Sequence, residues 1–183
     1  MNWGLQKTAV VGGKEYDIRT DYRCILDIMT ALADPELDDQ ARAYVALSIF
    51  YPDFEEIPQS DYQEAIKECF RFINGGGEED KRKRPRLIAW EQDFQHIVAP
   101  INRVMGQDIR GLEYCHWWTF LAAYMEIGDC TFAQIVRIRS KLAKGETLDK
   151  SDRKWYRENR QLVDIKKTYT NEDQDLLKQW GAV

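Results

Sequence analysis

Within residues 8–32, TAVVGGKEYDIRTDYRCILDIMTAL, the sequence pattern changes from one that favours β-strands to one that favours an α-helix. Two short β-favouring stretches, residues 8–11 and 15–19, flank Gly12-Gly13, and this arrangement predicts a β-hairpin. Thr20 or Asp21 can then cap a helix. The apolar residues that follow at helical spacing are Ile25, Leu26, Ile28, Met29 and Leu32. We therefore expect a hairpin that leads directly into a helical protein.

Two more helices are predicted before residue 75. Pro35 suits the first turn of the second helix, which Tyr51-Pro52 ends. Ser60 and Gln63 have the spacing of a capping box at the start of the third helix, which Asn74-Gly75 ends. These segments form the first helical part of the chain.

Three helices are predicted over residues 87–104, 112–127 and 131–144. Pro100 is expected to kink or interrupt the first of them, and Thr131 can cap the last, which ends at Gly145. The strongly charged residues beyond predict one long polar helix with a thin apolar stripe. The predicted fold is mainly α, a short N-terminal β-hairpin followed by about six or seven packed helices.

The length of 183 residues is typical of one domain, so we expect a single domain over residues 1–183. Residues 75–86, GGGEEDKRKRPR, contain nothing apolar to bury and predict a mobile linker. The predicted parts are a β-hairpin at 1–20, helical parts at 21–74 and 87–145 on either side of the linker at 75–86, and a charged helical tail at 146–183.

The composition favours a cytoplasmic protein that binds other proteins. Hydrophobic residues make up 44%, aromatic residues 12% and charged residues 31%, which is typical of a packed globular chain. The net charge of −5 and the acids beside the KRKRPR run argue against a nucleic-acid partner. The sequence has no apolar stretch long enough to cross a membrane and no signal-peptide pattern at its start.

Two carboxylate-x-x-histidine pairs, Asp93 with His96 and Glu113 with His116, raise the hypothesis of a helical di-iron site. Bridging carboxylates would have to come from Asp27 and from Glu64 or Glu68, and the context of these residues singles none of them out. The alternative is a His116 that packs at the edge of the core with one nitrogen hydrogen-bonded. The four cysteines contain no C-x-x-C pair. We therefore predict no metal site and no cofactor.

No nucleophile elbow, phosphate-binding loop or dinucleotide fingerprint occurs, so no catalytic residues are predicted. The stretch EYCHWWTF, residues 113–120, indicates a binding surface instead. Adjacent residues on a helix point about 100° apart, so two neighbouring tryptophans cannot share one narrow face. We expect one of them to fill the core between helices and the other, with Tyr114, Leu121 or Tyr124, to reach a second subunit or partner. Large aromatic side chains concentrate binding energy at interfaces. The predicted partner-binding residues are Tyr114, Trp117, Trp118, Leu121 and Tyr124.

Several stretches in order resemble one phage protein family, called gene product fifteen, of siphophages and prophages. The stretches are YDIRTDYR (16–23), ALSIFYPDFEEIP (46–58), EAIKECFRFINGG (64–76), WEQDFQHIVAPINRVMGQDI (90–109) and LEYCHWWTFLAAY (112–124). The resemblance covers about residues 14–160. In that family the position of His96 is not typically histidine, which weakens the di-iron hypothesis.

Genes of that family generally lie between those of the major tail protein and the tape-measure protein, where tail-assembly chaperones are encoded. The resemblance therefore implies a non-enzymatic assembly factor that binds the tape-measure protein and the tail-tube protein in the host cytoplasm. We also expect a homo-oligomer. The alternatives are a structural tail or connector component retained in the virion, and the helical metalloprotein described above.

Overall fold

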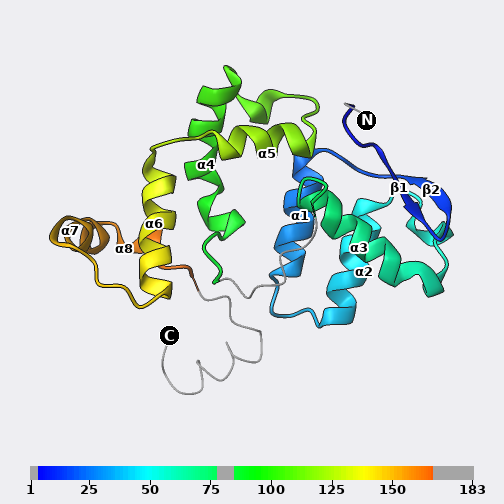
Figure 1. Cartoon of the computed structure of the whole chain (residues 1–183), viewed down its shortest axis with the longest axis horizontal. Helices are drawn as coiled ribbons and strands as arrows, with labels where there is room; N and C mark the ends of the chain where they lie inside the picture. Colours follow the sequence, from blue (N-terminus) through cyan, green and yellow to red (C-terminus); the bar gives the residue numbers. More distant parts are fainter. Residues whose placement is uncertain (1–3, 78–84, 167–183) are drawn as a thin grey trace. The chain divides into compact units, whose positions relative to one another are not determined.

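The computed structural model describes residues 4–77 and 85–166, which form two compact helical units (Figure 1). We call residues 4–77 the first unit and residues 85–166 the second unit. The charged linker predicted at 75–86 and the tail predicted at 146–183 fall partly on residues 78–84 and 167–183, which lie outside the described residues.

The hairpin consists of β1 (Thr8–Val11) and β2 (Lys14–Asp17), paired antiparallel with Val11 opposite Lys14. Gly12 and Gly13 both have positive φ, at 57° and 77°, as a tight two-residue turn requires. A Cβ atom at Gly12 would also lie 2.4 Å from the Asp61 carboxylate. The positive φ angles favour glycine at both positions, and the nearby Asp61 carboxylate leaves no room for a side chain at Gly12. The predicted hairpin is confirmed.

Three α-helices complete the first unit: α1 (Tyr22–Leu32), α2 (Asp39–Phe50) and α3 (Tyr62–Ile73). The Asp21 side chain caps α1, as predicted, by accepting from the N–H of Arg23 at 2.9 Å. Short 3₁₀ turns at Phe54–Glu56 and Gln59–Asp61 connect α2 to α3. The fully buried core residues of this unit include Ile25, Ile28, Ala46, Leu47, Phe50, Tyr51, Ala65, Cys69 and Phe72.

Two predicted helix starts in this unit were wrong. Asp38, not Pro35, precedes α2, because its carboxylate accepts the N–H of Ala41 at 2.7 Å. Ser60 lies in a 3₁₀ turn and its hydroxyl donates to the Asp61 carboxylate, so the capping box with Gln63 does not form. Both errors concern how a helix begins, and the predicted helices themselves, α2 and α3, are present.

The second unit contains α4 (Trp90–Met105), a 3₁₀ turn (Ile109–Gly111), α5 (Trp117–Met125) and α6 (Thr131–Ala143). The helix α4 continues through Pro100, which is buried, rather than ending there. Cys130, not Thr131, caps α6, since its sulfur accepts the N–H of Ala133.

The predicted long polar helix is instead two short helices, α7 (Lys150–Glu158) and α8 (Arg160–Val163). Asn159 separates them, and its side-chain amide donates to the carbonyl of Trp155 at 2.9 Å. The backbone of Asn159 leaves the helical conformation, with φ −121° and ψ 26°, and α7 ends at Glu158.

The fold class is confirmed: the described residues contain one two-stranded hairpin and eight α-helices. No helix within residues 4–77 and 85–166 is long and apolar enough to cross a membrane.

Candidate functional site

The helix α5 begins five residues later than predicted, because His116 is its N-cap. The imidazole Nδ1 accepts the backbone N–H of Trp118 at 3.0 Å, which satisfies a donor of the first turn. His116 is 2% exposed. The histidine that the sequence offered as a metal ligand therefore positions the start of the aromatic helix.

Two of the five predicted binding residues pack inward, Trp117 in the buried core and Tyr124 half-buried at its edge. Trp117 is 1% exposed and stacks on Phe120, with ring centroids 5.4 Å apart and an interplanar angle of 17°. Tyr124 packs its ring against Trp90 at 5.8 Å and Phe132 at 6.0 Å. Burial raises the pKa of the Tyr124 hydroxyl to about 12. Trp117 and Tyr124 both contact Trp90 of α4, and Tyr124 also contacts Phe132 of α6.

The outward face of α5 is apolar. Trp118, Leu121, Ala122 and Met125 follow at i, i+3, i+4 and i+7, the spacing of one helical stripe. Ala122 is exposed, Met125 is 73% exposed, and Trp118 and Leu121 are half-buried. No charged residue occurs between 117 and 125. We call these four residues the α5 face.

The sequence prediction included Trp118 and Leu121 but missed Ala122 and Met125. Their spacing from Trp118 would have identified them once the helix start was known. Tyr114, 51% exposed, precedes the helix and is not part of the stripe. The structure thus separates the predicted set into core residues, face residues and one residue in the preceding loop.

The residues of the di-iron hypothesis are not assembled into a metal site. Glu113 and His116 lie before α5 rather than on a helix, so their i, i+3 spacing does not bring them to one face. Asp93 is completely buried, and its carboxylate binds Arg139 at 2.6 and 3.0 Å. Among the described residues, no three His, Cys, Asp or Glu side chains lie close enough to hold a metal ion.

Arg139 organises the second unit, and the sequence analysis did not single it out. Its guanidinium pairs with Asp93 and also donates to the carbonyls of Leu87 at 2.9 Å, Leu162 at 2.8 Å and Val163 at 2.6 Å. These bonds join α6 to α4, to the segment before α4 and to α8. The only sequence signal was an arginine at an inward position of an amphipathic helix.

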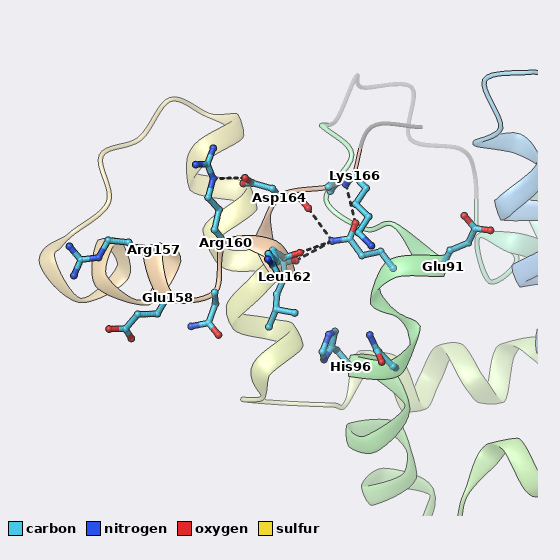
Figure 2. A pocket seen from close by; sticks show the side chains of 13 residues that line it. Glu91, His96, Arg157, Glu158, Arg160, Leu162, Asp164 and Lys166 are labelled. Atoms are coloured by element: carbon cyan, nitrogen blue, oxygen red, sulfur yellow. Dashed lines mark hydrogen bonds and ion pairs between the residues drawn. The ribbon is translucent and has the colours of Figure 1, made fainter. Parts of the chain in front are cut away.

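Next to this ion pair, a cleft of about 1120 Å³ separates α4 from residues 157–166 (Figure 2). Gln92 spans one side of it: its Nε2 donates to the carbonyl of Asp164, and its Oε1 accepts the N–H of Lys166, both at 3.0 Å. His96 lines the cleft from α4. The lining is mixed in charge, with Glu91, Glu158 and Asp164 beside Arg157, Arg160 and Lys166.

The comparison with protein families decides the affiliation of the chain. A family model described as "Bacteriophage Gp15 protein" matches residues 5–165. The chain belongs to this family. Searches of curated proteins and of solved structures found no significant match.

The matched region of this Gp15-family protein runs from the residues before the hairpin to the segment held by Gln92. It therefore includes the α5 face, the Asp93–Arg139 pair and helices α7 and α8. The family resemblance noted from five sequence stretches is confirmed, and the protein is a bacteriophage protein.

Proposed function

We propose that this phage protein is a tail-assembly chaperone that binds the tape-measure protein and assists assembly of the tail tube. The observation that carries the proposal is the α5 face. A helix of a globular protein normally turns a polar face to water, whereas α5 has apolar residues both inward and outward.

An apolar helical stripe is suited to a helical partner. Side chains at i, i+3, i+4 and i+7 pack into the grooves of another amphipathic helix. The family resemblance points to the tape-measure protein, since such proteins are long helices with apolar stripes that need cover before they polymerise. Contact with the α5 face would exclude water from both stripes.

The proposal includes the tail-tube protein as a second partner, self-association of the chaperone, and action in the host cytoplasm. It assigns no catalytic step and no cofactor. The gene position implied by the resemblance supports these elements of the role.

Co-expression with the tape-measure protein of the same phage tests the proposal. Wild-type protein should keep the tape measure soluble and co-purify with it. The variant Ala122→Lys/Met125→Lys places two charges on exposed positions of the α5 face, so it should fold normally and lose most of the co-purified tape measure.

Leu142→Lys is the matched control, because Leu142 is also an exposed apolar residue, 40% exposed, but lies at the end of α6. It should behave as the wild type does. If the wild type does not retain the tape measure, or if all three proteins retain it equally, the proposed role of the α5 face is wrong.

A further inference from the structure

The helix α7 carries a row of basic residues on its outer surface. Lys150, Arg153, Lys154 and Arg157 are all exposed and follow at i, i+3, i+4 and i+7. Figure 2 shows Arg157 directed away from α4. We call these four residues the basic face.

The orientation of α7 follows from its one buried acid. Asp152 is 3% exposed and accepts from Arg137 at 2.9 Å and from Lys141 at 2.7 Å, both on α6. This contact holds the acidic side of α7 against α6. Within the described residues, none of the four bases of the basic face has an acidic partner within ion-pair distance.

The two units have opposite charge. Residues 4–77 contain 14 acidic and 7 basic residues, whereas residues 85–166 contain 11 acidic and 13 basic residues. The basic face therefore belongs to the positive unit of a protein whose other unit is strongly negative. Such an arrangement favours association between unlike units of two copies.

The first unit has a matching acidic groove of about 380 Å³ beside the end of α2. Asp53, Glu55 and Glu56 line it, and Lys14 pairs with Glu56 at 2.8 Å. Tyr44 also lines the groove, is 56% exposed, and meets the edge of Phe54 with ring centroids 5.1 Å apart. Carboxylates beside an exposed aromatic ring suit lysine or arginine side chains.

We infer that the basic face of α7 in one copy binds the acidic groove of a second copy. The interface joins two different surfaces, so each bound copy still offers one surface of each kind. Such head-to-tail contacts form closed rings or open rows of subunits. The inference concerns self-association and does not depend on binding of the tape-measure protein.

Sedimentation of the full chain over a range of protein and salt concentrations tests the inference. Oligomers should form as protein concentration rises at about 50 mM salt and dissociate at about 500 mM, because exposed charges are screened. Lys150→Glu/Lys154→Glu should weaken self-association at least about tenfold. Lys150 lies in the first turn of α7, where an acidic residue suits the helix dipole, and Lys154 is exposed, so the fold should be retained.

Asp53→Lys/Glu55→Lys should weaken self-association by a similar factor. Mixing this variant with Lys150→Glu/Lys154→Glu should restore association, since the reversed groove of one then meets the reversed face of the other. Lys7→Glu/Lys67→Glu is the control, because it changes the net charge equally at exposed residues outside both surfaces.

The inference is overturned if the wild type is monomeric at low salt, if the control weakens association as much, or if the mixture fails to associate. It is also overturned if the basic face binds a short DNA or RNA duplex, and its charge reversal removes that binding but leaves self-association unchanged.

Discussion

Arg139 uses all five of its N–H donors, two on the buried carboxylate of Asp93 and three on backbone carbonyls. Arg139→Met would leave the Asp93 carboxylate buried, with the N–H of Ala89 as its remaining donor. We expect a loss of about 3–5 kcal/mol in the free energy of unfolding, measured by urea denaturation.

Asp93→Leu/Arg139→Met removes both charges and is the matched control for this prediction. It should recover part of the loss, because no uncompensated charge remains in the core. A single-variant cost of under about 0.5 kcal/mol, typical of surface positions, would contradict the assigned role of Arg139.

The adjacent tryptophans of α5 should respond differently to alanine. Trp117→Ala removes a fully buried ring that stacks on Phe120, so it should cost about 3–5 kcal/mol of stability. Trp118→Ala should preserve helicity and weaken tape-measure binding by about 2 kcal/mol, roughly thirtyfold. Circular dichroism and a binding titration measure these effects, and equal loss of fold in both variants would make Trp118 a core residue too.

Asp152 of α7 joins that helix to Arg137 and Lys141 of α6. Its hydrogen bonds with Arg137 and Lys141 lower the pKa of Asp152 from 3.8 to about 2. The folded pKa lies below the unfolded one, so the stabilisation is complete above about pH 4 and is lost as the pH falls towards 2. Unfolding of wild type and Asp152→Asn, followed at several pH values, should show a stability difference that shrinks over this range. If the difference in stability between the two proteins stays constant from pH 7 to pH 2, the ionised Asp152 carboxylate does not stabilise the fold.

The elements were predictable where a local signal determines them. The hairpin followed from Gly12-Gly13, and α1 followed from the Asp21 cap and its apolar spacing. The start of α5 was missed because a histidine cap is unusual, and the apolar residues before it, such as Leu112, continue the helical pattern. The break at Asn159 and the outward side of α7 depend on contacts with other segments, which no local pattern reveals.

The candidate binding site was predictable only in part, because it also depends on contacts between segments that are distant in the sequence. The sequence placed a binding surface at the tandem tryptophans, but burial by Trp90 and Phe132 decides which aromatic rings face inward. The Asp93–Arg139 pair joins residues 46 positions apart, so no local pattern could identify Arg139 as the partner of Asp93.

For the molecule as a whole, a chaperone should leave the tail when assembly ends. We therefore expect mass spectrometry of purified virions to find no peptides of this protein, while lysates of infected cells contain it. Recovery from virions at the level of a tail component would support the alternative, a structural or connector protein.

Hydrogen–deuterium exchange of the whole protein shows whether the α5 face contacts the tape-measure protein. Exchange is measured with and without a tape-measure fragment that co-purifies. We expect slower exchange in residues 116–126 when the fragment is bound, because a covering helix excludes water from α5. If the fragment binds but exchange slows only elsewhere in the chain and not in residues 116–126, the α5 face is not the contact surface.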